Sequence, residues 1–338
     1  MRALFDLCSG FVYSQVLLAC TRLELFETLY QHPRTAAELA DALEMPRSSI
    51  DRLLEAAESL QLVQVHGRER FGLGPLGAAL LGNPAVAMMV EHHSAFYADL
   101  NDPVGLLRGE LQGAELQGFW AYSGSARPQD LGSEDTRAYS QLMAASQALI
   151  ADQVLSAYPF DRHRRLLDVG GGSGAFVQAA VTRHARLEAC VFDLPSVAEQ
   201  ARERFDRLDS GERASASAGD FLADSLPAGF DLITLVRVLH DHDDDAALSI
   251  LRSVRRAIAS DGVLLIAEPM LRTRGAEPVG AAYFGFYLMA MGQGRPRSVS
   301  DITSLLRQAG FMAPKEHRTS APLLVRVLTV RPLDQTHL

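Results

Sequence analysis

The stretch from Arg164 to Phe176 combines an acid with a run of glycines in an order that suits a charged, nucleotide-like ligand. A short apolar segment ends in Asp168 and leads into four glycines, Gly170, Gly171, Gly172 and Gly174. Glycine has no Cβ, so the backbone can turn tightly there and approach a ligand closely. A carboxylate just ahead of such a loop repels phosphate and attracts a cation or an amino group. The stretch therefore predicts a pocket for a positively charged ligand.

Two cofactors fit this glycine loop. Gly170, Gly172 and Ala175 satisfy the G-x-G-x-x-G/A pattern of dinucleotide-binding proteins, which on its own is a weak signal. Asp193 ends the next predicted strand, about 20 residues further on, where a carboxylate can accept the ribose hydroxyls of either nucleoside. Asp168 favours S-adenosylmethionine, because its α-amino group and sulfonium are positive, over a nicotinamide dinucleotide with its pyrophosphate.

A third group of residues completes the predicted cofactor pocket. Gly219, Asp220 and Phe221 follow the third predicted strand, where a carboxylate and an aromatic ring can bind and stack an adenine. Asp193 and Asp220 also have a plainer interpretation, because aspartate is a good N-cap and either residue could simply begin a helix.

A histidine and a glutamate are predicted to meet at the same sheet edge. His240 follows the fourth predicted strand and Glu268 ends the fifth, and ligands of open α/β sheets bind at the carboxyl ends of the strands. A histidine near a hydroxyl can act as a general base, and a carboxylate on its other ring nitrogen sets the tautomer. His242 is the alternative base, or an exposed residue with no role.

The run from His240 to Asp245 could instead bind a divalent cation through its clustered imidazole and carboxylate groups. However, Asp244 and Asp245 stand where a helix is predicted to begin, and the helix dipole stabilises acids in the first turn. We therefore predict no metal site.

Aromatic and methionine residues between the fifth strand and the last helix are candidates for an acceptor site. At helical spacing they form either a core face or the wall of a pocket for a long apolar molecule. This wall comprises Tyr283, Phe284, Phe286, Tyr287, Met289 and Met291, with His92, His93, Phe96 and Tyr97 as possible additions from the helical half. Arg295 and Arg297 either meet a polar end of the substrate or face solvent.

The composition and net charge of the chain indicate which classes of partner and which cellular compartment to expect. The net charge of −9 argues against a nucleic-acid partner, whose binding depends on basic clusters. Three cysteines without metal-ligand spacing indicate a reducing, cytoplasmic setting. No signal peptide is evident, and the near-apolar run 281–292 is too short to span a bilayer, which needs about 20 residues. Peripheral membrane contact stays open.

The first hundred residues predict a winged-helix module. Thr35 and Glu38 form a capping box that opens a helix, a second helix follows over 47–60, and strands over 62–65 and 71–73 form a hairpin. A winged helix can bind DNA, but the second helix carries two arginines against three carboxylates, the wrong sign for a major groove. Packing against another subunit is the favoured role.

From residue 164 the pattern changes to alternating strands and helices, which predicts an α/β domain with a doubly wound, mostly parallel, Rossmann-like sheet. Strands are expected at 164–169, 187–193, 213–218, 230–238, 262–268, 314–319 and 323–330. Helices are expected at 174–184, 196–206, 244–259 and from Ser298 to Gly310. The predicted organisation is a dimerisation domain over 1–100, a helical connector over 101–155 and a cofactor-binding catalytic domain over 156–333.

These motifs together resemble the two-domain S-adenosylmethionine-dependent O-methyltransferases over essentially the whole chain. The segments that carry the resemblance are Leu167 to Gly174, Phe192 to Pro195, Gly219 to Phe221, Val238 to Asp241 and Ala267 to Pro269. The resemblance implies a winged-helix dimerisation domain and a homodimer. It also implies that Leu194 and Arg237 join the cofactor pocket, that His240 is the base, that Glu268 holds its ring, and that S-adenosylhomocysteine is the product.

Within this family the chain is most similar to the carotenoid branch, the hydroxyneurosporene and demethylspheroidene type. The similarity lies in Phe11 to Leu18, Arg237 to Asp244, Tyr283 to Gly292 and His317 to Thr319. Enzymes with aromatic substrates usually have Trp at the position of His242 and an acid within the segment 295–297. The expected activity is methylation of a hydroxylated acyclic carotenoid. The alternatives are a phenol, a polyketide or a tetrapyrrole carbon as acceptor, or a winged-helix regulator that senses the cofactor.

Overall fold

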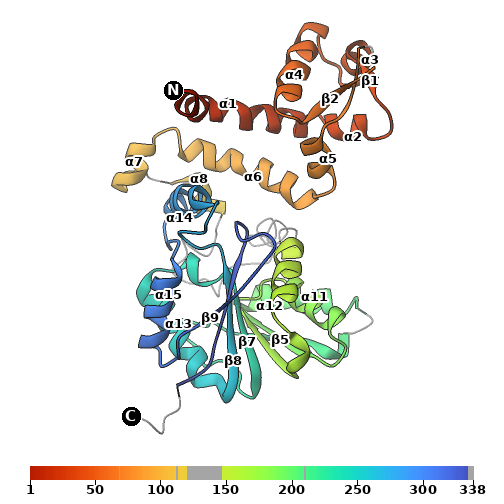
Figure 1. Ribbon diagram of the computed structural model, residues 1–338. Helices are drawn as coiled ribbons and strands as arrows, with labels where there is room; N and C mark the ends of the chain where they lie inside the picture. The colour runs from red at the N-terminus through yellow and green to blue at the C-terminus, as the bar shows by residue number, and fades with distance from the viewer. Residues whose placement is uncertain (68, 112, 120–146, 209–210, 334–338) are drawn as a thin grey trace. The chain divides into compact units, whose positions relative to one another are not determined.

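The computed structural model describes residues 1–67, 69–111, 113–119, 147–208 and 211–333 (Figure 1). Internal contacts divide the chain into two compact units, Met1–Ser94 and Ala95–Leu338. About half of the predicted connector over 101–155 belongs to the stretch 120–146, which lies outside the described residues.

The first unit contains helices and a small three-stranded antiparallel sheet of order β1-β3-β2. Its elements are α1 (Arg2–Arg22), α2 (Leu25–Tyr30), β1 (Arg34–Thr35), α3 (Ala36–Ala42), α4 (Arg47–Ser59), β2 (Val63–His66), β3 (Arg70–Leu73), α5 (Pro75–Leu81) and most of α6 (Pro84–Asp99). The predicted capping box is present, since Glu38 N donates to Thr35 Oγ1 and Thr35 N donates to Glu38 Oε2. The short strand β1 was not predicted.

The second unit contains a seven-stranded sheet of order β6-β5-β4-β7-β8-β10-β9. Its strands are β4 (Arg165–Val169), β5 (Glu188–Asp193), β6 (Ala214–Ala218), β7 (Phe230–Val236), β8 (Ile258–Glu268), β9 (Lys315–His317) and β10 (Arg326–Val330). The strands from β6 to β8 are parallel, and β10 is antiparallel to both of its neighbours. The predicted mostly parallel, doubly wound sheet is confirmed.

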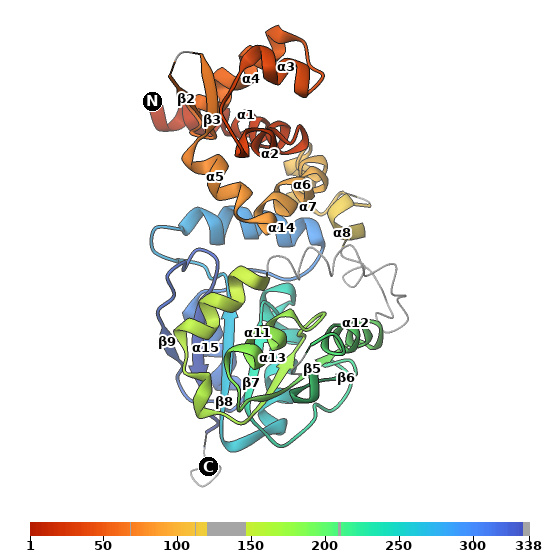
Figure 2. The same cartoon turned by 90° about the vertical axis from the view of Figure 1, so that its right-hand side faces the viewer.

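Helices cover both faces of this sheet, which is why its central strands are apolar throughout rather than alternating (Figures 1 and 2). Leu167 packs with α13 (Asp244–Ala257) and α15 (Val299–Gln308) on one face. Its neighbour Leu166 packs with α11 (Ala175–Arg183) and α12 (Pro195–Phe205) on the other. Helical residues 147–157 also contribute to this second cluster.

A π-helix (Val279–Tyr283) leads into α14 (Phe284–Met291), which packs with α7 (Pro103–Arg108) and α8 (Glu115–Phe119).

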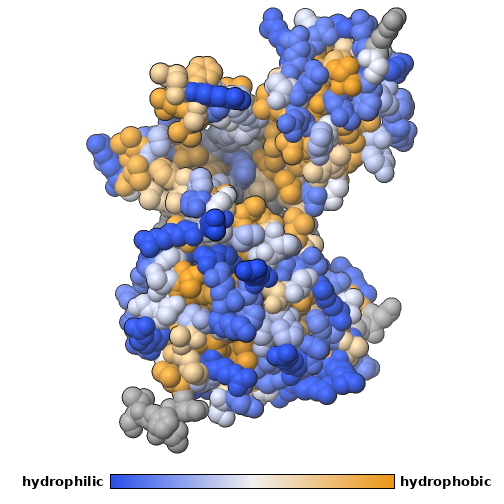
Figure 3. Space-filling view, in the orientation of Figure 1, coloured by the Kyte–Doolittle hydropathy of each residue, from blue (hydrophilic) through white to orange (hydrophobic). Residues whose placement is uncertain are grey.

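The helix α1 leaves much of its apolar surface uncovered within this chain. It is 21 residues long and apolar enough, by length and composition, to cross a membrane, and 11% of its apolar stretch is buried. The longest apolar helix of the described residues is therefore α1 and not the run 281–292, on which the prediction about membrane spanning was based. Leu4, Phe5 and Leu7 are all exposed, and Figure 3 shows hydrophobic residues gathered near the start of α1. A helix that packs on another subunit has the same composition.

Candidate active site

The carboxyl ends of β4, β5, β7 and β8 carry the predicted site residues. Asp168 and Asp193 lie at the ends of adjacent strands, and Glu268 ends β8. The chain leaves β4 toward β5 on one side of the sheet and later adds β7 on its other side. Loops diverge at such a switch point, and the crevice between them is where ligands of open sheets bind.

The glycine loop follows β4 and has three residues with positive φ, Gly170, Gly172 and Gly174. A Cβ at Gly174 would come within 2.5 Å of the Phe205 ring, and one at Gly170 within 2.9 Å of Val238. At Gly172 a Cβ would meet no heavy atom within 4 Å. The outer two glycines therefore serve packing, whereas the middle one borders the space available to a ligand.

Asp193 holds this loop in place. One of its carboxylate oxygens accepts the N–H of Gly172 and the other accepts the N–H of Leu194, both at 2.8 Å. Burial nevertheless raises the pKa of Asp193 to about 6. Each oxygen retains a second lone pair, so the carboxylate can still accept a ribose hydroxyl.

Asp168 is 1% exposed, and Thr234 on the adjacent strand donates to its Oδ1 at 2.6 Å. Its Oδ2 has no hydrogen-bond partner in the described part of the chain. Burial raises the pKa of this carboxyl to about 7, although the Thr234 bond opposes the shift. A buried oxygen without a partner is costly, and an ammonium group is a suitable partner for it. The residues present therefore fit the α-amino group of S-adenosylmethionine.

One of the predicted adenine residues, Phe221, borders the same loop. The Phe221 ring lies 3.5 Å from the Cβ position of Gly170, and Gly219 packs tightly under Phe192. Asp220 accepts the N–H of Leu222 in a turn, and no helix begins there, so the alternative interpretation as a helix N-cap does not hold for this residue. Arg237, just after β7, has a left-handed φ of 56°, a conformation that is uncommon outside glycine and is often found at functional sites.

The structure brings His240 and Glu268 together as predicted and adds Asp241. A single turn of 3-10 helix, Leu239–Asp241, folds Asp241 back onto the ring, so its Oδ1 lies 3.0 Å from His240 Nε2. On the other side His240 Nδ1 lies 3.5 Å from Glu268 Oε2, which also accepts the backbone N–H of His240. The His240 side chain is thus enclosed between two carboxylates, and it is 3% exposed.

These charges determine the protonation of the histidine. Burial alone lowers the pKa of His240, but Asp241 and Glu268 outweigh burial and raise it to about 9. Neither contact is aligned as a hydrogen bond, and His240 Nδ1, Asp241 Oδ1 and Glu268 Oε1 have no such partner among the residues that the structure covers. Buried polar atoms without a hydrogen-bond partner can bond to a polar group of a ligand. Sequence reasoning considered Asp241 only as a metal ligand, although its place beside His240 was the available signal.

His242 is half-buried, not exposed as one alternative had it. Its ring packs edge-on against Phe221 with ring centres 5.5 Å apart, and burial lowers its pKa. Within the described residues, no group of three or more His, Cys, Asp or Glu side chains is arranged to bind a metal ion.

Phe284 of the acceptor wall contacts His240, and other aromatic residues of the wall contact one another. The Phe284 ring lies edge-on to the His240 ring, with ring centres 6.0 Å apart, and edge-on to the Tyr283 ring, with ring centres 4.9 Å apart. The centre of the Phe96 ring lies 6.3 Å from that of Tyr283 and 5.4 Å from that of Tyr287. Tyr287 and Met291 are almost fully buried, which favours the core interpretation for them. Burial raises the pKa of Tyr283 to about 12, so its phenol stays neutral.

Other predicted substrate residues are less well placed. Tyr97 is half-buried on α6 next to Phe96, and His93 belongs to the first unit, where burial lowers its pKa. The two arginines of the segment 295–297 differ. Arg295 is exposed, as one of the two predictions had it, and pairs with Asp244 at the surface. Arg297 is fully buried against backbone carbonyls, which neither prediction anticipated.

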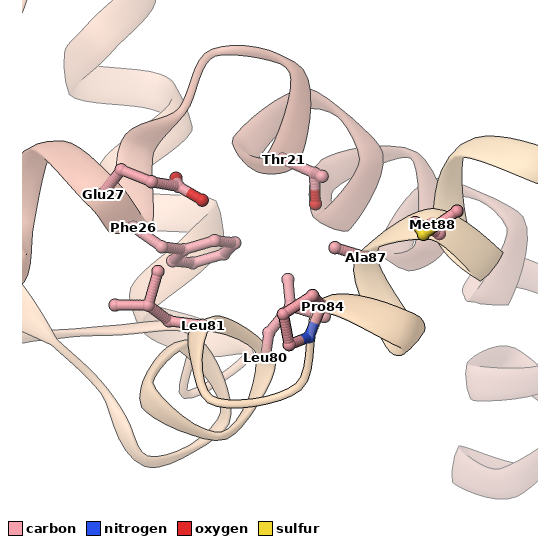
Figure 4. A pocket seen from close by; sticks show the side chains of 8 residues that line it. All are labelled: Thr21, Phe26, Glu27, Leu80, Leu81, Pro84, Ala87 and Met88. Atoms are coloured by element: carbon pink, nitrogen blue, oxygen red, sulfur yellow. The ribbon is translucent and has the colours of Figure 1, made fainter. Parts of the chain in front are cut away.

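A separate hollow of about 260 Å³ lies within the first unit (Figure 4). Its lining is mainly apolar and consists of Thr21, Phe26, Glu27, Leu80, Leu81, Pro84, Ala87 and Met88. None of these residues belongs to the predicted site.

Comparison with known families matches both parts of the chain. Residues 97–312 match the O-methyltransferase domain, and residues 5–83 match the O-methyltransferase dimerisation domain. Demethylspheroidene O-methyltransferase of Rhodobacter capsulatus is 39% identical over 96% of this chain and 81% of its own length. The enzyme of the same name from Cereibacter sphaeroides is 38% identical over 98% of this chain and 87% of its own.

Solved structures agree. The S-adenosylmethionine-dependent methyltransferase SibL is 27% identical with a TM-score of 0.82, covering 98% of this chain and 99% of its own. The neocarzinostatin O-methyltransferase NcsB1, solved with S-adenosylmethionine and 2-hydroxy-5-methyl naphthoic acid, is 28% identical with a TM-score of 0.69, covering 95% and 96%. The chain therefore belongs to the S-adenosylmethionine-dependent O-methyltransferases, with an N-terminal dimerisation domain of that family.

Proposed function

We propose that this enzyme methylates a hydroxyl group of an acyclic carotenoid, with His240 as the general base. The observation that carries the base assignment is the buried His240 between Asp241 and Glu268, beside the aromatic wall. The acceptor class rests on the two demethylspheroidene O-methyltransferases, which are 38–39% identical to this chain, against 31% for the acetylserotonin enzyme of Mus musculus.

The cofactor contacts follow from the loop geometry. Asp168 would bind the α-amino group, Asp193 the ribose, and Asp220 and Phe221 the adenine, with the open space at Gly172 admitting the ligand. When bound, S-adenosylmethionine supplies an electrophilic sulfonium methyl group. Holding an acceptor in line with that methyl group can contribute about 7–11 kcal/mol to catalysis.

The role of His240 depends on its raised basicity. An aliphatic alcohol is far less acidic than a phenol, so its proton must leave as the new O–C bond forms. The acceptor hydroxyl would take the place of Asp241 at Nε2 and transfer its proton to that nitrogen. Glu268 holds Nδ1 and stabilises the imidazolium that results. The methyl ether and S-adenosylhomocysteine are the products.

The experiment is an incubation with methyl-labelled S-adenosylmethionine and a panel of hydroxylated polyenes, phenols, aromatic polyketides and tetrapyrroles. We expect label in a polyene methyl ether. Label mainly in a phenol or polyketide, or on a tetrapyrrole carbon, would contradict the acceptor class. A gel shift with genomic DNA and no methyl transfer would instead support a cofactor-sensing regulator.

The dimerisation domain supports a homodimer formed through the first unit, with the exposed apolar side of α1 as part of the interface. We further propose a cytoplasmic enzyme whose apolar acceptor requires peripheral membrane contact. Light scattering tests the dimer, and flotation with vesicles of phosphatidylcholine and phosphatidylglycerol tests the membrane contact. A monomer in solution, or no flotation, would refute the respective proposal.

A further inference from the structure

The segment between α14 and α15 lies directly against the turn that carries His240. We call residues 292–298 the strap and residues 238–244 the His240 turn. Gly294 in the strap has a φ of 83°, and a Cβ there would be 2.4 Å from the carbonyl oxygen of His240. The backbone N–H of Arg295 donates to that same carbonyl at 2.9 Å. The strap and the turn therefore pack backbone against backbone.

Arg297 closes this contact from the inside. Its side chain is fully buried, and its Nη1 donates to the carbonyl of Leu239 at 2.6 Å. Its Nη2 donates to the carbonyl of His242 at 2.8 Å, so the guanidinium bonds to the two residues that flank His240 and Asp241.

The same guanidinium also ties the turn to the following helix. Nε and Nη2 donate to Oδ1 of Asp244, in the first turn of α13, at 2.9 and 2.8 Å. A planar guanidinium presents several donors in a fixed fork, whereas an ammonium group is a single point charge. Arg297 makes four hydrogen bonds here, whereas a lysine ammonium has only three donors.

We infer that Arg297 is a positioning residue of the methyl-transfer reaction, which sets the His240 turn so that the imidazole faces the acceptor hydroxyl. The inference rests on the proposed role of His240 as base. The strap also continues directly from α14, so one segment joins the aromatic wall to the turn that carries the base. Arg297 acts through His240 and is not itself a substrate contact.

The chain offers a matched control in Arg255, near the other end of α13. Arg255 donates to the backbone carbonyls of Gly310 and Leu333 at 3.0 and 2.8 Å, so it makes the same kind of bond away from the site. Arg255→Met removes comparable hydrogen bonds without touching the His240 turn. The Arg255→Met variant is expected to have a lower melting temperature than the wild type and an unchanged kcat.

The test is a double-mutant cycle on Arg297→Met and His240→Ala, with methyl transfer to a hydroxylated polyene as the readout. We expect Arg297→Met to lower kcat by about 100-fold, the effect of a misplaced reacting group, with cofactor binding by calorimetry changed less than threefold. Arg297→Lys should recover only part of this loss. If Arg297 acts through His240, the double variant is no slower than His240→Ala alone.

Several outcomes would overturn the inference. Multiplicative losses in the double variant would mean that Arg297 acts independently of His240. Equal kcat in Arg297→Met and Arg255→Met would mean that its role is structural only. Near-UV circular dichroism checks that each variant is folded. If Arg297→Met is unfolded, Arg297→Lys replaces it in the double-mutant cycle, and the same outcomes decide. Full activity of His240→Ala would refute the base assignment, whereas a normal Arg297→Met beside an inactive His240→Ala would refute the positioning role alone.

Discussion

Two histidine–carboxylate clusters lie at opposite ends of the same sheet and differ in how completely their polar atoms are paired. At the amino ends of the strands, His163 Nε2 bonds to the hydroxyl of Tyr158 at 2.8 Å, and its Nδ1 lies 3.2 Å from Asp231. Asp231 also accepts the backbone N–H groups of Arg164 and Arg165. At the carboxyl ends, His240 has two carboxylates within 3.5 Å but spare polar atoms on all three side chains.

The difference separates structure from function. A buried polar cluster whose atoms are all paired fixes the fold and has no capacity left for a ligand. A buried cluster with unpaired atoms is costly unless a ligand completes it. The His163 cluster anchors the starts of β4 and β7, whereas the His240 cluster awaits a hydroxyl.

Replacing each histidine by asparagine tests whether the His163 cluster is structural and the His240 cluster functional. His240→Asn should lower kcat by about 10²–10⁴-fold, because general-base assistance is lost. His163→Asn should lower the melting temperature and leave kcat within threefold. Methyl transfer assays and thermal unfolding on both variants provide the measurement, and comparable activity losses would invalidate the distinction.

The pH dependence tests whether the carboxylates control His240. Since the imidazole must be neutral to accept a proton and its pKa is raised to about 9, kcat/KM of the wild type should increase with pH up to about 9. Glu268→Gln removes one carboxylate, so the pKa of His240 falls. The rising part of the plot of kcat/KM against pH should then move to lower pH. We also expect kcat to fall by about 10–100-fold. If the rising part of the pH profile lies at the same pH in the wild type and in Glu268→Gln, a group other than His240 is titrating.

The unpaired oxygen of Asp168 makes a matching prediction for the cofactor. Only the ionised carboxyl attracts an ammonium group, and burial raises the pKa of Asp168 to about 7. Affinity for S-adenosylmethionine should therefore rise as the pH increases through about 7, with protons released on binding. Calorimetry in buffers of different ionisation enthalpy measures the release. Asp168→Asn should bind about tenfold more weakly and lose the pH dependence, and a pH-independent wild type would refute the assignment.

The smallest effects are expected from the glycine loop. Gly172→Ala places a methyl group in open space, so the folded state should lose only about 1 kcal/mol from the left-handed backbone. Cofactor affinity should fall more than stability does, because the methyl group occupies ligand space. Gly174→Ala drives a methyl group into Phe205 and should destabilise the protein more strongly. Unfolding and binding curves of both variants decide this, and the reverse order would place the ligand elsewhere.

Local patterns predicted most of the sheet and its helices. The strand ending near Asp168, the capping box at Thr35, and the helices starting near Asp244 and Ser298 all depend on neighbouring residues, and each is present. The meeting of His240 and Glu268 followed from strand order, because the ends of adjacent parallel strands share an edge.

The features that were not predicted depend on contacts between distant segments. Arg297 reaches the carbonyl of Leu239, 58 residues earlier, and nothing in its own surroundings marks it as buried. Asp241 turns onto the His240 ring because a 3-10 turn follows the strand, and no local pattern predicted that turn. The short strand β1 forms because β3 supplies an edge for Arg34 and Thr35.

The antiparallel strand β10 has a consequence for how this protein is made. It is the last of the seven strands in sequence, yet it lies between β8 and β9, pairs with β8 over five residues and contributes Val327 and Leu328 to the two hydrophobic clusters. Until the ribosome has released residue 330, β8 therefore remains an open edge beside an incomplete core. The exposed edge of β8 favours aggregation while residues 269–330 are being synthesised, and a chain that ends before β10 lacks part of both hydrophobic clusters.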